Sequence, residues 1–136
     1  MIFNYKKYFI DRADNEPVSD NDICRIITMF VQDGKCYVTK ELLLPNEREL
    51  HHRRPRQYGG EDLVENTVYI LTIIHKMIHA KTESEYFKYF KQHPLTLEQV
   101  ITVNQLRVEA RVKPIEMTPK YLPYINQLNN SKEKSV

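Results

Sequence analysis

Residues 49–80 read ELHHRRPRQYGGEDLVENTVYILTIIHKMIHA and contain four of the five histidines in the chain. His51 and His52 are adjacent, whereas His75 and His79 stand at positions i and i+4. Neighbouring side chains of a strand point to opposite faces, while side chains at i and i+4 of a helix share one face. The stretch therefore predicts strands and a helix that bring several imidazoles together.

Hydrophobic spacing places the elements within this stretch. Residues 49–53 read as an extended piece that stops at Pro55, and residues 68–70 read as a second short strand. From residue 72 the spacing becomes helical, and Ile74 and Ile78 fall where a helix would face the core. The predicted order is therefore strand, long loop, strand and helix.

Another helix is predicted upstream of this stretch. It starts at Asp20, its apolar residues recur at helical spacing, and it ends at Gly34. Residues 35–44 then read as a strand followed by a turn. We expect the apolar side of the upstream helix to pack against the core through Ile23, Ile26, Ile27, Phe30 and Val31.

Two further helices are predicted downstream, each from a capping pattern at its N-terminus. Thr82 with Glu85 starts the first of them. Thr96 with Gln99 starts the second, which extends to about Lys113. Together with the strands, these helices predict an α+β fold.

The length of 136 residues suits one compact domain. We expect this domain at residues 20–118, preceded by an irregular arm at residues 1–19 and followed by a partly disordered tail at residues 119–136. Charges near the N-terminus and the lack of a long apolar run argue against a signal peptide and against a membrane span. Cys24 and Cys36 form no disulfide pattern, so we expect buried thiols in a cytoplasmic protein.

The charge of the whole chain says little about its partners, since 20 Lys and Arg stand against 18 Asp and Glu, a net charge of +2. The distribution of charge is more informative. Arg53, Arg54 and Arg56 follow the adjacent histidines, where they could grip a phosphate backbone, and Lys76 could widen the same basic face. A solvated charged loop is the alternative interpretation of these arginines.

The histidines suggest metal chemistry. His75 and His79 lie one helical turn apart, which suits two ligands of one ion, although two surface histidines would give the same pattern. His51 and His52 cannot both point at one atom from a regular strand. One of them can complete a three-imidazole metal site while the other acts as a general base, a role that imidazole can fill at neutral pH.

The loop between the two predicted strands carries further candidates. Asn66 stands just before the second strand, where its amide could hold the loop and orient the base through a hydrogen bond. A simple turn asparagine is the alternative interpretation. Gly59 and Gly60 suit a tight loop that needs positive φ.

The joint pattern of paired histidines, a central asparagine and a helix with HxxxH resembles the HNH endonuclease family. It is most similar to the HNH domain at the C-terminus of bacterial group II intron reverse transcriptases, where a GKC-V-T stretch precedes the histidine pair and a P--GG-D---N loop follows it. Residues 34–39 read GKCYVT here. The loop positions are occupied by Pro55, Gly59, Gly60, Asp62 and Asn66. The similarity extends from about residue 20 to about residue 114.

This resemblance implies a ββα-metal core at about residues 36–81 with additional flanking helices. It implies that the metal ligands are His51, His75 and His79. It also implies that His52 is the general base and that Asn66 positions this base. One divalent ion, Mg²⁺, Mn²⁺, Ni²⁺ or Zn²⁺, is the expected cofactor.

The activity implied by the resemblance is metal-dependent hydrolysis of phosphodiester bonds in DNA, most simply duplex DNA, by nicking or double-strand cleavage. The alternative is an HNH-fold binding module or inhibitor from a phage or mobile element, which contacts nucleic acid or a protein partner without cleaving. A nuclease toxin with a silencing partner is a third reading, which the modest charge does not support. A homodimer is compatible with the nuclease reading. An intact His52 argues against the binding module, since a structural metal site has no need of a neighbouring free imidazole.

Overall fold

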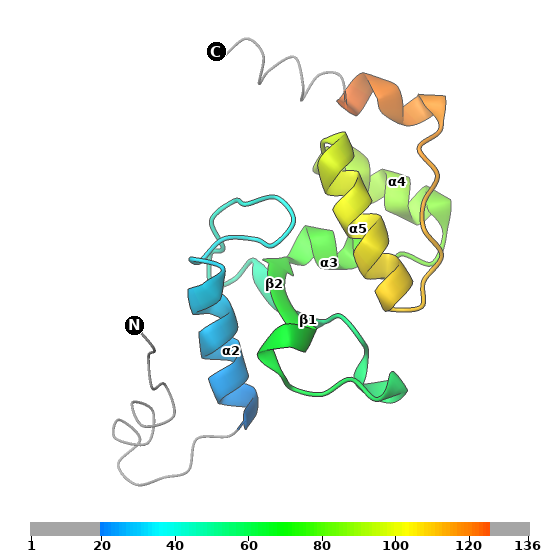
Figure 1. Ribbon diagram of the computed structural model, residues 1–136. Coiled ribbons are helices and arrows are strands. Elements are labelled where there is room, and N and C mark those ends of the chain that lie inside the picture. The colour runs from blue at the N-terminus through cyan, green and yellow to red at the C-terminus, as the bar shows by residue number, and fades with distance from the viewer. Residues whose placement is uncertain (1–19, 126–136) are drawn as a thin grey trace, which may run out of the picture.

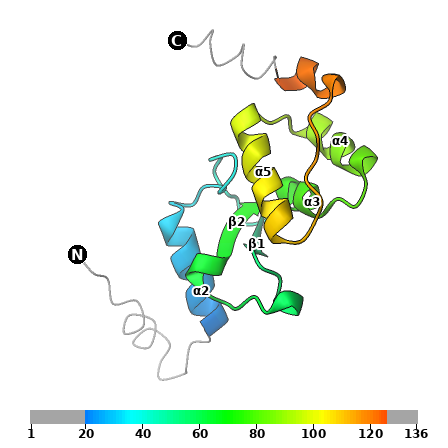
Figure 2. The same ribbon diagram turned by 45° about the vertical axis from the view of Figure 1, so that its right-hand side comes forward.

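The computed structural model describes residues 20–125, and these residues form a mixed α+β structure, which confirms the predicted class (Figure 1). In chain order the elements are α2 (Asp20–Val31), β1 (Arg48–His52), η1 (Arg56–Tyr58), η2 (Val64–Asn66), β2 (Thr67–Leu71), α3 (Thr72–His79), α4 (Glu83–Gln92), α5 (Leu97–Glu109) and η3 (Pro119–Tyr121). The hairpin of β1 and β2 lies in the middle, with α2 on one side and α3, α4 and α5 on the other (Figure 1, Figure 2).

The hairpin fixes which residues of β1 face the helices. β1 and β2 pair antiparallel, with His51 opposite Val68 and His52 opposite Thr67. All of β2 is buried, as its β-branched and aromatic residues favour. β2 passes directly into α3, because Leu71 is still extended and Thr72 begins the helix. This junction lays α3 against β1, and the side chains of His75 and Glu49 meet there.

Helix α3 forms the centre of the core. Ile74, Met77 and Ile78 are each 0% exposed, which confirms the predicted inward direction of the two isoleucines. Helix α4 packs Tyr86 and Phe90 into the same core, and α5 adds further apolar side chains. Complete burial of one such side chain contributes about 1.5–3 kcal/mol, so this packing holds α3 firmly in position.

A buried arginine ties α5 to the C-terminal end of α3. Arg107 is 2% exposed, and its Nη1 donates to the carbonyls of Met77, Ile78 and Ala80 at 2.7, 3.2 and 3.1 Å. The last carbonyls of a helix lack partners within the helix, and a cation there also complements the helix dipole. Arg107 therefore caps α3 at the turn that carries His79.

Helix α2 is oriented by polar contacts. Its buried residues Cys24 and Thr28 meet Thr67 at the start of β2, with Cys24 Sγ at 3.1 Å and Thr28 Oγ1 at 3.0 Å from Thr67 Oγ1. Because these buried polar contacts fix which side of α2 faces β2, part of the apolar side of the helix faces solvent. The prediction that this side faces the core is wrong for three residues, which are 46%, 77% and 67% exposed: Ile26, Phe30 and Val31.

Two predicted elements differ from the structure. Residues 35–44 form turns with one isolated bridge between Lys35 and Leu42. The backbone of this segment bonds mostly to itself, and the nitrogen of Tyr37 makes a single hydrogen bond to the carbonyl of Tyr69 in β2, so no ladder forms. Helix α5 ends at Glu109, earlier than predicted, because Arg111 adopts the left-handed conformation with φ 62°. Both cysteines are free and buried, as predicted.

The packed chain continues past the predicted boundary at residue 118. Tyr121 is 0% exposed, and its ring meets those of Phe87 and Phe90 edge to face. Its hydroxyl also donates to Glu83 Oε1 at 2.6 Å. This segment therefore belongs to the domain, since it covers one side of α4.

The predicted arm at residues 1–19 and the end of the predicted tail, residues 126–136, lie outside the described residues. Across residues 20–125, no helix has the length and the apolar character that crossing a bilayer requires.

Candidate metal centre

Three imidazoles converge where β1 meets α3. His51 comes from β1, and His75 and His79 come from successive turns of α3. Their candidate ligand nitrogens all lie within 4.8 Å of one another. The ring centroids of His75 and His79 are 4.7 Å apart, and that of His51 is 5.3 Å from each. These residues, which we call the histidine cluster, could hold one metal ion.

The cluster runs from the core to the surface. His51 is buried at 2% exposure, His75 is half-buried, and His79 is exposed. Burial, followed by repulsion from His75 and His79, lowers the pKa of His51 from 6.5 to about 3. Burial also lowers the pKa of His79, with smaller contributions from His75 and Arg107. A metal ligand must be neutral imidazole, and these shifts keep His51 and His79 in that form at neutral pH.

An unsatisfied atom supports the metal assignment. His51 Nε2 is buried and has no hydrogen-bond partner among the described residues. A buried polar atom without a partner costs about 1–3 kcal/mol. Three imidazoles also match the protein ligand set of a catalytic metal site, which leaves coordination positions open. The residues present therefore fit a divalent ion, and the ion would give Nε2 the partner it lacks.

A carboxylate behind the cluster orients one of its imidazoles. His75 Nδ1 lies 2.9 Å from Glu49 Oε2. Glu49 and His51 are two residues apart on β1, so both side chains lie on the face toward α3. A carboxylate that accepts from Nδ1–H leaves Nε2 of the same ring as the ligand atom, and this partner strengthens metal ligation. Sequence reasoning missed Glu49, although its position two residues before His51 was an available signal.

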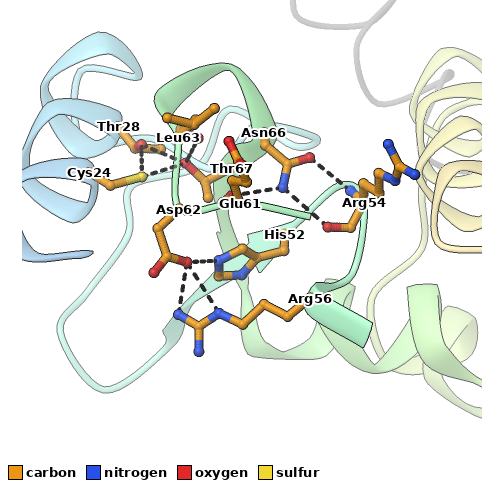
Figure 3. A network of polar contacts seen from close by, with 10 residues as sticks. All are labelled: Cys24, Thr28, His52, Arg54, Arg56, Glu61, Asp62, Leu63, Asn66 and Thr67. Atoms are coloured by element: carbon orange, nitrogen blue, oxygen red, sulfur yellow. Dashed lines mark hydrogen bonds and ion pairs between the residues drawn. The ribbon is translucent and has the colours of Figure 1, made fainter. Parts of the chain in front are cut away.

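His52 points away from the histidine cluster, toward the loop between the strands. Its Nε2 lies 2.7 Å from Asp62 Oδ1, and Arg56 Nη2 donates to the same oxygen at 2.8 Å (Figure 3). The hydrogen bond with His52 and the one with Arg56 lower the pKa of Asp62. The carboxylate is therefore ionised at neutral pH, where it can only accept hydrogen bonds. His52 Nε2 must then be the donor of this hydrogen bond, so in the neutral ring Nδ1 is the nitrogen that can accept a proton.

Asn66 holds the loop through its side-chain amide. Its Oδ1 accepts from the backbone nitrogen of Arg54 at 2.9 Å, and its Nδ2 donates to the carbonyls of Arg54 and Glu61 at 3.1 and 3.0 Å (Figure 3). The prediction of a loop-holding amide is therefore confirmed. The side chain that accepts a hydrogen bond from His52 is Asp62 instead, so Asn66 is connected to His52 only through the loop.

The two loop glycines serve different purposes. Gly59 has φ 86°, as predicted for a tight turn. Gly60 lacks a positive φ, but a Cβ at this position would lie 1.6 Å from the carbonyl oxygen of Arg54. Gly60 is therefore required because two backbone segments approach closely, which brings residue 62 within reach of His52.

Two of the predicted nucleic-acid-binding arginines are already paired. Arg53 donates through Nε and Nη2 to the carboxylate of Glu109, both at 3.0 Å, and Arg56 is held by Asp62. Arg54 donates through Nε to the carbonyl of Tyr58 at 2.7 Å. The structure therefore shows Arg53 joining the residue after β1 to α5, and Arg56 holding Asp62, the partner of His52.

Lys76, the remaining basic residue of the predicted site, is exposed on α3. Its Nζ lies 5.9 Å from the ring centroid of Tyr89 on α4. The position is one turn before Ala80 and on the same helix as His75 and His79. A role of Lys76 in nucleic-acid binding stays a prediction.

A scan against models of known protein families, a search of curated proteins and a search of solved structures each found no match. The site is therefore defined by its own chemistry. It combines three imidazoles where β1 meets α3 with one imidazole–carboxylate pair on the other face of β1.

Proposed function

We propose that this protein is a metal-dependent endonuclease with a ββα-metal core, which hydrolyses phosphodiester bonds of DNA with His52 as the general base. The observation that carries the proposal is the opposite direction of the two adjacent histidines. His51 is buried in the histidine cluster, whereas His52 is half-buried and bonded to Asp62. A purely structural metal site would leave the second imidazole and its carboxylate without a purpose.

Each residue has a task in hydrolysis. His52 Nδ1 accepts the proton of the attacking water, and Asp62 holds the ring and stabilises the imidazolium that results. His51, His75 and His79 would hold the divalent ion. The ion would supply Lewis-acid stabilisation of the charge that develops on the phosphoryl and departing oxygens. The exposure of His79 leaves this side of the cluster open to a substrate.

The donor set narrows the choice of metal. Three imidazole nitrogens suit Zn²⁺, Ni²⁺ and Mn²⁺, while Mg²⁺ prefers oxygen ligands and would need phosphate to complete its shell. The basic side chains near the loop favour a polyanionic substrate, and duplex DNA is the substrate that we propose. Base-edge readers are not evident among the site residues, so we propose weak sequence preference.

The test is cleavage of supercoiled plasmid by the purified protein with Mg²⁺, Mn²⁺, Ni²⁺ or Zn²⁺ in parallel. We expect nicking in at least one metal, and we expect its loss in His52→Ala and in His79→Ala. Calorimetric titration with the active metal separates the two variants, because only His79→Ala should lose binding. A matched control is His93→Ala, which removes a histidine paired with Glu41 outside the site.

Three outcomes are decisive. Nicking that His52→Ala abolishes while metal binding persists would support the proposed base. Equal nicking by wild type and His52→Ala would overturn the assignment. Metal binding by wild type without cleavage of any nucleic acid would favour the binding module over the nuclease.

A further inference from the structure

The backbone after α5 carries a strained arginine. Arg111 has φ 62°, the left-handed conformation that favours glycine. Its backbone nitrogen bonds to the carbonyl of Val108 at 3.0 Å, and that of Val112 bonds to the carbonyl of Arg107 at 2.7 Å. This pair of hydrogen bonds is the helix-ending motif in which glycine usually occupies the position of Arg111. Arg111 therefore keeps a side chain at a position where glycine would lower the strain of the backbone.

Strained backbone positions gather at functional sites, and an observed outlier is a reason to ask what the side chain does. The guanidinium carbon of Arg111 lies 4.2 Å from the ring centroid of Tyr58, in the loop between β1 and β2. Such a cation–π contact holds a charged side chain in place without neutralising it. The side chain is exposed, so the contact leaves the charge available to a ligand.

Arg111 lines a cleft of about 390 Å³ between this loop and the end of α5. Arg53, Arg54 and Asn66 also line it, together with Glu65 and Glu109. Three arginines and two carboxylates give the cleft one net positive charge, which complements the single negative charge of a phosphodiester. Asn66 is bonded to the backbone of Arg54, two residues after His52, so the cleft adjoins the proposed base.

The arginines of the cleft differ in availability. Arg53 is committed to Glu109 through two hydrogen bonds. Within the described part of the chain, no ion pair involves Arg54 or Arg111, and Arg54 uses only its Nε on a backbone carbonyl. A cleft lined by two guanidinium groups that make no ion pair has the chemistry of a phosphate site.

We propose that this cleft binds a backbone phosphate of DNA next to the phosphate that is cleaved, and that Arg111 and Arg54 are its ligands. The inference rests on the proposed nuclease function, and it adds Arg111 to the DNA-binding residues. It also accounts for the strained conformation of Arg111. A glycine at this position would relieve the backbone strain, but it would remove the guanidinium that binds the phosphate.

The test compares two proteins that both carry His52→Ala, one with Arg111 and one with Arg111→Gly. The background substitution and a chelator prevent cleavage during the binding measurement. Binding of a short fluorescent DNA duplex is measured by anisotropy at several salt concentrations. We expect affinity to fall about fivefold to tenfold, and the slope of log affinity against log salt to decrease by about one. We also expect the melting temperature to stay equal or rise, because glycine suits the left-handed position.

Lys40→Gly is the matched control. Lys40 has φ 64° and an equal charge, but it does not line the cleft. This variant should bind DNA with the affinity and salt slope of the unaltered sequence. Arg111→Lys should recover part of the lost affinity, since it restores the charge.

The outcomes separate this inference from the proposed function. If wild type nicks plasmid but Arg111→Gly leaves the affinity and the salt slope unchanged, the proposed phosphate site in the cleft is wrong and the proposed nuclease function is retained. DNA binding that depends on Arg111 in a wild-type protein that cuts nothing would support the cleft and overturn the nuclease. No binding of the duplex at low salt would also overturn the cleft.

Discussion

At the scale of single residues, the site depends on the alternation of side chains along β1. His51 and His52 are chemically identical, yet one is buried among two other imidazoles and the other is bonded to an aspartate. Each acquires its role from the face on which it lies. Asp62 is the residue that most directly determines which nitrogen of His52 can accept a proton.

Asp62→Asn tests this dependence on the carboxylate. An amide can donate as well as accept, so the substituted side chain would no longer fix the tautomer of His52 or stabilise its protonated form. We expect the single-turnover rate of plasmid nicking to fall on the order of a hundredfold. Metal affinity, measured by calorimetry, should stay unchanged because Asp62 does not touch the histidine cluster.

Glu61→Gln is the control for Asp62→Asn, since the side chain of Glu61 is exposed and only its backbone carbonyl is used by the loop. A full nicking rate in Asp62→Asn would contradict the proposed tautomer control. An equal loss in Glu61→Gln would point instead to general weakening of DNA binding by the loop.

At the scale of elements, α3 is held from both sides. Its inward face packs in the core, and Arg107 of α5 caps its last turn. Arg53 and Glu109 make a second link from β1 to α5 beside the loop. Helix α5 therefore positions both the candidate metal ligands and the proposed base, although it carries none of them.

Arg107→Met tests the cap on α3. Methionine preserves much of the apolar length, but it leaves the carbonyls of Met77, Ile78 and Ala80 without their donor. We expect the free energy of unfolding to fall by about 3 kcal/mol, measured by urea denaturation. Metal affinity should also decrease, because the last turn of α3 carries His79.

Lys113→Met is the control for Arg107→Met, because the side chain of Lys113 is exposed and only its carbonyl accepts from Arg107. This variant should keep wild-type stability. Unchanged unfolding of Arg107→Met would show that the carbonyls find other partners and that the cap is dispensable.

At the scale of the whole molecule, the histidine cluster links folding to pH. The pKa of His51 is lowered to about 3 in the folded protein, and that of His79 is also lowered. The unfolded chain therefore binds more protons than the folded protein between these values and 6.5. In metal-free protein, this contribution to stability is fully present above about pH 6.5 and is lost as the pH falls from there toward 3.

Urea denaturation in the presence of a chelator tests this linkage. We expect the free energy of unfolding to decrease between about pH 6.5 and about pH 5, by at most about 1.4 kcal/mol per pH unit for each histidine. The lowered carboxyl pKa values of Asp62 and Glu83 act at lower pH, so they do not obscure this window. In His51→Asn the free energy of unfolding should depend less on pH over this range. A wild-type free energy of unfolding that does not change with pH would contradict the prediction.

Local sequence patterns determined the elements that frame the site. The stop at Pro55 predicted the end of β1, strand-forming residues predicted β2, and helical spacing predicted α3. The spacing of His75 and His79 predicted their shared face, and the cap at Thr96 is a complete capping box. These features depend on strand and helix periodicity alone, which operates over a few residues. They were therefore accessible without a three-dimensional structure.

Only the tertiary structure decided which partners these elements would meet. The bond of Asp62 to His52 depends on how the loop closes at Gly60, and the cap by Arg107 joins residues far apart in sequence. The same holds for α2, whose buried side is set by contacts of Cys24 and Thr28 with β2. Periodicity specifies a face, but the identity of the neighbour on that face is decided by packing of the whole chain.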